Sequence, residues 1–268
     1  MHPMVNIALR AARQAGEIIA RASDRLDLIK VDSKGNNDFV TDIDKKAEQE
    51  VIYQLRQAYP DHAILSEEAG EAVELGDGGE YQWVIDPLDG TTNFLHGIPH
   101  FAVSIACLHR GRIEHAVIVD PIRREEFTAT RGSGAQLNGK RIRVSQAKGL
   151  TQTLMGTGNP LRKAQQPYFD AYFDTIREFS EQNAGIRWTG SAALDLAYVA
   201  AGRLDGFWEM KLKPWDIAAG ALLVLEAGGL VTDFHGGNDY YQSGNIVSAG
   251  PKCLRPMLQI VKPKLGSI

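Results

Sequence analysis

The sequence predicts a layered α/β (α+β) fold, and three observations support this prediction. The chain has 268 residues, 44% of them hydrophobic, which is enough to bury a substantial core. Its first half contains two stretches of helical periodicity followed by several short strand-like segments. Its second half alternates helices with strands, as layered folds do. The change near Ala147 to Gly149 predicts two parts, residues 1–147 and 148–268, within one compact structural unit.

The first half begins with two predicted helices. Apolar residues recur at helical spacing from Ile7 to Ala22. The glycine and asparagines of Lys34 to Asp38 favour a turn. Thr41 can cap a second helix, which Pro60 ends. Short segments with the composition of strands follow, and we expect them to be antiparallel. They are Ala63–Ser66, Trp83–Ile85, Phe101–Leu108, Ile113–Val119 and Phe127–Ala129.

The second half predicts helices and strands in alternation. Strands are expected at Thr153–Met155, Gly206–Met210, Val231 and Ile246–Val247. Helices are expected at Tyr168–Phe179, Ala192–Ala201 and Asp216–Ala227, and a short helix is expected at the C-terminal end.

Composition excludes several classes of protein. The net charge is −4, with 33 acidic and 29 basic residues, so there is no basic stripe for nucleic acid. Cys107 and Cys253 lack the spacing of a metal or redox pair, and their apolar neighbours predict buried free thiols in a reducing compartment. The chain shows neither a signal peptide nor an apolar run of the roughly 18 residues that a membrane span needs. We therefore expect a cytoplasmic protein without membrane contact.

The most informative motif is a pair of acids, Asp86 and Asp89, at the end of a short apolar strand. Pro87 restricts the backbone between them, so both carboxylates can be held rigidly. Gly90 and Thr91 then form a turn into a short helix, whose free N–H groups suit a phosphate oxygen. Ligands for a hard cation therefore lie beside donors for an anion. Metal-assisted phosphoryl transfer needs this arrangement.

The alternative interpretation is that Asp86 begins a turn and Asp89 caps a helix. It explains poorly why two acids follow a strand that itself requires burial, because uncompensated buried carboxylates are costly. Two further segments can supply carboxylates, namely Glu67-Glu68 after a second strand and Asp216 at the start of a helix. Glu67-Glu68 could instead be a solvated pair in a loop, and Asp216 could be a simple helix N-cap. Spacing in the sequence alone does not determine whether these carboxylates lie together in the folded protein.

These motifs resemble those of the inositol monophosphatase family. The matching blocks follow the order of the family over nearly the whole chain: Ser66–Glu68, Asp86–Phe94, Gly190–Ala193, Trp215–Gly220 and Glu226–Gly229. The segment Gly190 to Arg203 further resembles the bacterial SuhB branch. The resemblance implies a layered αβαβα sandwich and a magnesium-dependent, lithium-sensitive phosphatase that is typically a homodimer.

The resemblance also implies two to three magnesium ions per site. Glu67, Asp86 and the carbonyl of Leu88 would bind the first ion. Asp86, Asp89 and Asp216 would bind the second, and a weaker third ion would rely on Glu67 and waters.

Catalysis is expected from ions and positioning rather than from a protein nucleophile. Thr91 and Glu67 would orient and deprotonate the attacking water, and the N–H groups of Gly90 and Thr91 would hold the phosphate. The segment Lys34 to Asp44 resembles a mobile metal-binding loop of the family. Within it, Asp38 and Asp44 are either outer-shell groups or residues that shape the loop and cap the helix.

The leading substrate is myo-inositol 1-phosphate. Glu209 matches a family position that accepts hydrogen bonds from ring hydroxyls, and the alternative is a solvent-facing residue at a strand end. The catalytic residues are expected to be Glu67, Asp89 and Thr91. The expected substrate-binding residues are Leu88, Asp89, Gly90, Thr91, Gly190, Ser191, Ala192, Glu209 and Asp216.

Two alternatives remain open. Relatives with the same metal motif act on fructose bisphosphate, nucleotide or histidinol phosphates, but a second charged group needs a basic cluster. Only Lys211 and Lys213 lie near Glu209 in the sequence. The resemblance to the SuhB branch implies a function of a different class, as a protein-binding factor in ribosomal RNA transcription antitermination complexes. RNA polymerase or NusA would then be the partner, and nothing in the composition points to it.

Overall fold

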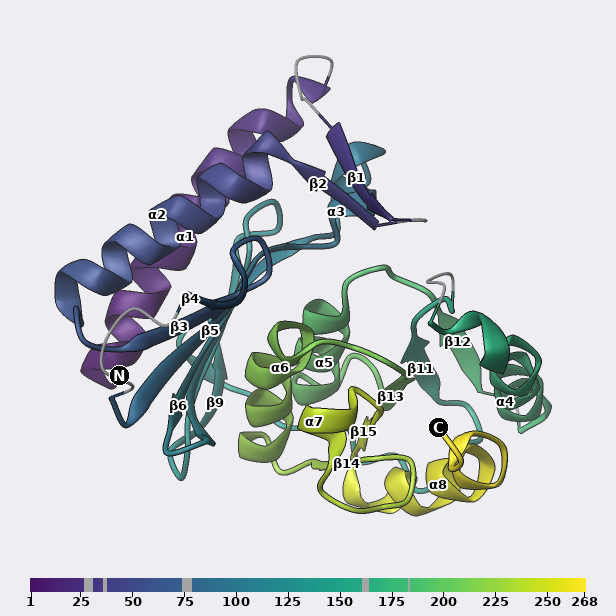
Figure 1. Cartoon of the computed structure of the whole chain (residues 1–268). Coiled ribbons are helices and arrows are strands. Elements are labelled where there is room, and N and C mark those ends of the chain that lie inside the picture. Colours follow the sequence, from purple (N-terminus) through teal and green to yellow (C-terminus); the bar gives the residue numbers. More distant parts are fainter. Residues whose placement is uncertain (27–30, 36–37, 74–78, 161–163, 183) are drawn as a thin grey trace.

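The computed structural model describes residues 1–26, 31–35, 38–73, 79–160, 164–182 and 184–268. Helices and β-sheets alternate in five layers within this part of the chain (Figure 1). The layers run from α1 and α2, through a large sheet, to α5 and α6, and then through a smaller sheet to α4 and α8. The predicted αβαβα sandwich is therefore confirmed. The helices are α1 (Pro3–Ser23), α2 (Asp42–Ala58), α3 (Thr91–Leu95), α4 (Phe169–Glu181), α5 (Ala192–Ala200), α6 (Pro214–Glu226), α7 (Tyr240–Ser243) and α8 (Pro251–Leu265), with a 3₁₀ turn at Gln166–Tyr168.

The large sheet has the strand order β10-β9-β8-β7-β6-β5-β3-β4 among the described residues. Its strands are antiparallel except for β3 and β5, which are parallel, so the expectation of a wholly antiparallel run was wrong for this pair. Parallel pairing has a consequence for the site, because the C-terminal ends of β3 and β5 meet at one edge. The strands are β3 (Ala63–Ser66), β4 (Gly70–Val73), β5 (Tyr81–Asp89), β6 (Ala102–His109), β7 (Arg112–Asp120), β8 (Glu125–Thr130), β9 (Gly134–Leu137) and β10 (Lys140–Arg141).

The smaller sheet has the order β12-β11-β13-β15-β14 and comes entirely from the second half of the described chain. Its first three strands in that order are parallel, and β15 is antiparallel to both of its neighbours. The strands are β11 (Leu154–Thr157), β12 (Gly185–Arg187), β13 (Gly206–Glu209), β14 (Leu230–Thr232) and β15 (Ile246–Ala249). Residues 142–153 connect the two sheets, and the predicted boundary at residue 147 falls within them.

Three clusters of buried apolar side chains hold the layers together. One fills the space between α1, α2 and the large sheet, and includes Val51 and Val117. The central cluster joins both sheets through α5 and α6, with Phe127 from one sheet and Phe207 from the other. The third, which includes Met257, packs α4 and α8 against the outer face of the smaller sheet. Since α5 and α6 contribute to the contacts of both sheets, they fix how the sheets meet.

Two local predictions differ from the structure. The polar stretch predicted as a turn overlaps an antiparallel pair: Lys34 and Gly35 end β1 (Val31–Gly35) and Asp38 begins β2 (Asp38–Thr41), while residues 36–37 between them lie outside the described residues. The C-terminal helix α8 has 15 residues rather than the few expected, although Pro256 and Pro263 lie inside it. Its apolar face is buried along its length, and this burial offsets the backbone hydrogen bonds that the prolines remove. None of the described helices is long and apolar enough to span a membrane.

The crossing of α5 and α6 leads to a prediction about stability. A methyl group at Gly220 would lie 2.6 Å from Leu196 Cδ1, so Gly220→Ala must push the helices apart. We expect a loss of about 1–3 kcal/mol in unfolding free energy, only partly offset by the roughly 1 kcal/mol by which alanine favours a helix over glycine. Urea denaturation measures this difference. At Gly16 in α1 the added methyl would lie 3.2 Å from Pro121 Cβ, so Gly16→Ala serves as a milder control.

Candidate metal and phosphate site

A bulge in β5 brings the two acids of the central motif onto one side of the sheet. Asp86 pairs with Ser104 of β6 and Asp89 pairs with Ala102, so three steps along β5 correspond to two along β6. In a regular strand, residues three apart face opposite sides. Because the bulge next to Pro87 adds one residue to β5, the carboxylates of Asp86 and Asp89 face the same side of the sheet.

The two acids meet a third from the other half of the chain. Oxygens of Asp86, Asp89 and Asp216 lie within 4.8 Å of one another, and Asp86 is only 1% exposed. Burial, and then the charges of Glu67, Asp89 and Asp216, raise the pKa of Asp86 well above its ordinary value. A divalent cation would remove this penalty. Three buried carboxylates at this separation fit the oxygen ligands that magnesium prefers.

Glu67 lies beside this cluster because β3 runs parallel to β5. Ser66 is opposite Ile85, and the backbone N–H of Glu67 donates to the carbonyl of Ile85 at 3.2 Å. Glu67 is half-buried, lines the same cavity and contributes most among the acidic neighbours to the raised pKa of Asp86. The structure thus brings together the four carboxylates predicted as metal ligands.

Two of the acids also cap helices of the central layer. Asp89 Oδ2 accepts hydrogen bonds from Ser191 Oγ at 2.5 Å and from the N–H of Ala193 at 2.8 Å, both at the start of α5. Asp216 Oδ2 accepts from the N–H of Lys213 at 2.7 Å at the start of α6. Each carboxylate therefore has one oxygen held by a helix N-terminus. This fixes the direction of the other oxygen.

Thr91 follows the acids and lies at the start of α3. Its hydroxyl is 3.1 Å from Asp44 Oδ1 and 3.0 Å from the carbonyl of Leu88. Asp44 also caps α2, because its Oδ2 accepts from the N–H and the hydroxyl of Thr41. Burial raises the pKa of Asp44, and the hydrogen bonds from Thr41 and Thr91 oppose this shift. Asp44 is thus both a cap and a neighbour of the site, whereas the side chain of Asp38 lies outside the described residues.

Gly90 permits the tight turn into α3. Its φ of 98° is in the left-handed region, and a methyl group there would lie 3.0 Å from the carbonyl oxygen of His100. The N–H groups of Gly90 and Thr91 make no hydrogen bond to a backbone carbonyl within the described chain. These donors line the cavity next to the carboxylates.

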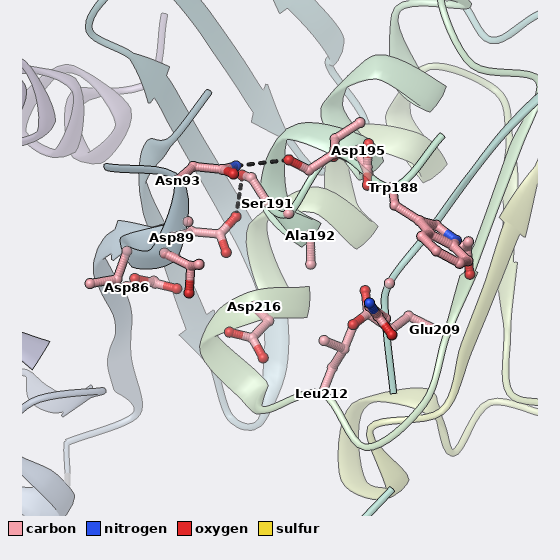
Figure 2. Close-up of a pocket in the computed structure, with 18 of the residues that line it drawn as sticks. Asp86, Asp89, Asn93, Trp188, Ser191, Ala192, Asp195, Glu209, Leu212 and Asp216 are labelled. Carbon is pink, nitrogen blue, oxygen red and sulfur yellow. Dashed lines mark hydrogen bonds between the residues drawn. The ribbon is translucent and has the colours of Figure 1, made fainter. Parts of the chain in front are cut away.

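The cavity has a volume of about 450 Å³ and extends from the acids to the smaller sheet. Figure 2 shows Asp86 and Asp89 on one side of it, Glu209 on the other, and Ala192 and Asp216 between them. Gly190 and Ser191 line it as well, so every residue predicted for the substrate lies on this cavity. The carboxylate of Glu209 lies directly over Gly158, where any side chain would displace it.

Sequence reasoning missed several residues of the cavity, and two of them, Asn93 and Asp195, are polar groups buried at its wall. Asn93 Nδ2 donates to the carbonyls of His100 at 2.8 Å and Thr189 at 2.7 Å, which ties the two halves of the site together. Asp195 is buried in α5, and its pKa is raised by burial. Both stand in motifs that the sequence analysis quoted, but neither has a spacing that distinguishes it from a packing residue.

Comparison with known proteins agrees with this geometry. A model of the inositol monophosphatase family matches residues 1–261. The chain belongs to the inositol monophosphatase family. The resemblance that the acidic motifs indicated is therefore confirmed, and it extends over almost the whole chain.

Similar family members include proteins named Nus factor SuhB. The one from Pseudomonas aeruginosa is 57% identical over 265 residues, which cover 99% of this chain and 98% of that protein. The one from Escherichia coli is 53% identical over 266 residues, with 99% and 98% covered. The extragenic suppressor protein suhB of Bartonella henselae has a TM-score of 0.91 at 44% identity, covering 96% of this chain and 97% of that one. The inositol monophosphatase of Anabaena has a TM-score of 0.83 at 35% identity, with 98% of each covered.

The electrostatics of the acidic cluster predict that one substitution stabilises the protein when no metal is bound. Without metal, the raised pKa of Asp86 means that stability falls as the pH rises above the ordinary aspartate value of 3.8. Asp86→Asn removes this penalty, so in chelator at neutral pH we expect a higher melting temperature than for the wild type. The difference should shrink in acid, where Asp86 is protonated in both folded and unfolded wild type.

Asp61→Asn provides the control, because Asp61 is exposed and outside the cluster. Its melting temperature should follow that of the wild type. If Asp86→Asn is less stable than the wild type in chelator at neutral pH, the carboxylate has a compensating partner and the interpretation is wrong.

Proposed function

We propose that this protein hydrolyses small phosphate monoesters with magnesium, and that myo-inositol 1-phosphate is its leading substrate. One observation carries the proposal. Three buried carboxylates from two halves of the chain converge within 4.8 Å and face a fourth, Glu209, across the same cavity. A set of cation ligands opposite a hydrogen-bond acceptor suits a substrate with a phosphate at one end and hydroxyls at the other.

The carboxylates suit two ions that share Asp86. Glu67, Asp86 and the carbonyl of Leu88 would hold one, and Asp86, Asp89 and Asp216 the other. A third, weaker ion would rely on Glu67 and waters. When bound, magnesium would supply a water of lowered pKa and offset negative charge on the leaving ester oxygen.

The protein contributes positioning. The hydroxyl of Thr91 donates toward Asp44 or Leu88, so its lone pairs remain available to accept a hydrogen bond from the attacking water. Glu67 faces the same space and would complete the orientation of that water and take up its proton. The N–H groups of Gly90 and Thr91 would hold phosphate oxygens in line for attack. Little more is required for a loose phosphoryl transition state.

Selectivity for polyols would come from Glu209. Its carboxylate is half-buried, and Gly158 leaves it room. Two adjacent ring hydroxyls could donate to its two oxygens, and a ligand without hydroxyls cannot make these hydrogen bonds. Gly190, Ser191 and Ala192 line the wall between Glu209 and the metal ligands and would contact the ring.

Phosphate release from myo-inositol 1-phosphate tests the function. We expect release with magnesium, none with chelator, and suppression by lithium. Asp89→Asn should keep the fold and lower kcat at least about 100-fold, the upper range for losing support at a metal site. Full activity of this variant would refute the metal assignment. Fructose 1,6-bisphosphate and a nucleotide phosphate should be assayed in parallel, and a clear preference for either would replace the proposed substrate.

Glu209→Gln tests the substrate specificity. Losing a charged acceptor for ring hydroxyls should lower kcat/KM for inositol phosphate by about 10- to 100-fold. The rate with p-nitrophenyl phosphate, which has no ring hydroxyls, should change little and serves as the internal control. Equal losses on both substrates would show that Glu209 does not select polyols.

Association with transcription complexes is a second candidate function. It is favoured by relatives named Nus factor SuhB at 50–57% identity over nearly full length. We propose that this chain binds RNA polymerase or NusA independently of hydrolysis. In pull-downs with the purified proteins, Asp89→Asn should bind as well as the wild type. Failure to retain either partner at low salt would contradict this role.

We also propose that the protein forms a homodimer. Arg187 and Trp188 are exposed at and beside β12, the edge strand of the smaller sheet, and are the proposed contact. Light scattering should give twice the 29.4 kDa mass of one chain, and a single-chain mass would contradict it.

A further inference from the structure

A second cavity lies at the opposite surface of the large sheet from α6. It has a volume of about 270 Å³, lies between the N-terminal end of α1 and strands β8 and β9, and shares no residue with the first cavity. Its polar lining comes from His2, Thr128, Thr130, Ser133 and Gln136.

The register of the sheet explains why this face is polar. Phe127 and Ala129 of β8 belong to the central core, so Thr128 between them faces the α1 side. Thr128 is opposite Gln136 of β9, and Gln136 is opposite Arg141 of β10. The side chains of Thr128, Gln136 and Arg141 therefore form a polar row on the face of the large sheet against which α1 packs. Farther along that face, α1 makes apolar contacts with the sheet.

Several donors on this face have no acceptor. Thr128 is only 4% exposed, and its hydroxyl has no hydrogen-bond partner among the described residues. The guanidinium of Arg141 lies against Gly134, 3.1 Å from where a methyl group would be, and forms no ion pair with any described residue. His2 Nδ1 accepts from the N–H of Met4, so the neutral ring carries its proton on Nε2.

The electrostatics of the cavity favour an anion. The first turn of α1, a helix of 21 residues, contains no acid to offset the positive end of its dipole. Two carboxylates on adjoining segments accept hydrogen bonds, and that of Glu126 is also paired with a cation. Glu126 accepts two hydrogen bonds from Arg13, at 2.6 and 2.8 Å. Glu226 accepts from the N–H groups of Gly132 and Gly134, at 2.8 and 2.7 Å.

We propose that this cavity is a second, metal-independent site that binds the phosphate group of a small phosphorylated molecule. Arg141, which is exposed and lies against Gly134 of the cavity wall, and the start of α1 supply the positive charge, and Thr128 supplies a hydroxyl donor. Gln136 and Ser133 can then contact the uncharged part of the ligand. This site is separate from the proposed catalytic centre and does not depend on its activity.

Nuclear magnetic resonance can test the site with inorganic phosphate as the probe. The full-length ¹⁵N-labelled protein is titrated in chelator, so that the first cavity holds no magnesium. We expect saturable shifts of the amide signals of Thr128, Gly134 and Gln136. Arg141→Gln should weaken the binding at least about tenfold, because it removes a charged partner.

Lys140→Gln is the matched control. Lys140 is the neighbour of Arg141 and is opposite Leu137, so its side chain lies on the other face of β10. The Lys140→Gln variant loses one positive charge, as Arg141→Gln does, and should bind phosphate like the wild type. Thr128→Val keeps the shape of the side chain and should also weaken binding, with the melting temperature measured to confirm folding.

Three outcomes would overturn the proposal. The first is the absence of a saturable shift at these amides. The second is an equal loss in Arg141→Gln and Lys140→Gln, which would indicate general attraction by charge. The third is shifts confined to Gly90 and Gly190, which would place all binding in the first cavity.

Discussion

The structure depends on one electrostatic constraint, the burial of several carboxylates where its two halves meet. Asp86, Asp89 and Asp216 approach within 4.8 Å of one another, and Glu67 adds a fourth negative charge. Such a cluster is unfavourable by itself, because burial and mutual repulsion both oppose ionisation. Its presence in the middle of a well-packed molecule is explained by a function that requires a cation.

The fold supplies the cluster through local features that each have a structural cost. A bulge interrupts the pairing of β5, a left-handed glycine begins α3, and two helices of the central layer have carboxylates at their N-termini. Since α5 and α6 pack against both sheets, their N-termini bring Ser191 and Asp216 to the carboxyl end of β5. A displacement of either helix would therefore alter the ligands of the proposed ions directly, which links the packing of the core to the proposed activity.

The sequence predicted most of this arrangement because its signals are local. The acidic motif after an apolar strand, the helix caps and the alternation of elements can all be read from neighbouring residues. The bulge that aligns Asp86 with Asp89 could not be read in this way, because it depends on the register with β6. The parallel pairing of β3 and β5 was missed for the same reason. Asn93 and Asp195 were missed because their roles arise from contacts between distant segments. The second cavity likewise appears only when two strands, β8 and β9, and α1 are placed together.

The most direct test of the account is calorimetric titration of the metal-free protein with magnesium in buffers of different ionisation enthalpy. The account predicts saturable binding with release of protons, because a bound cation lowers the raised pKa of Asp86. Proton release should increase as the pH is lowered, and Asp216→Asn should weaken binding. If magnesium does not bind, or binds equally well to Asp216→Asn, the convergence of these acids does not form a metal site and the proposed mechanism is wrong.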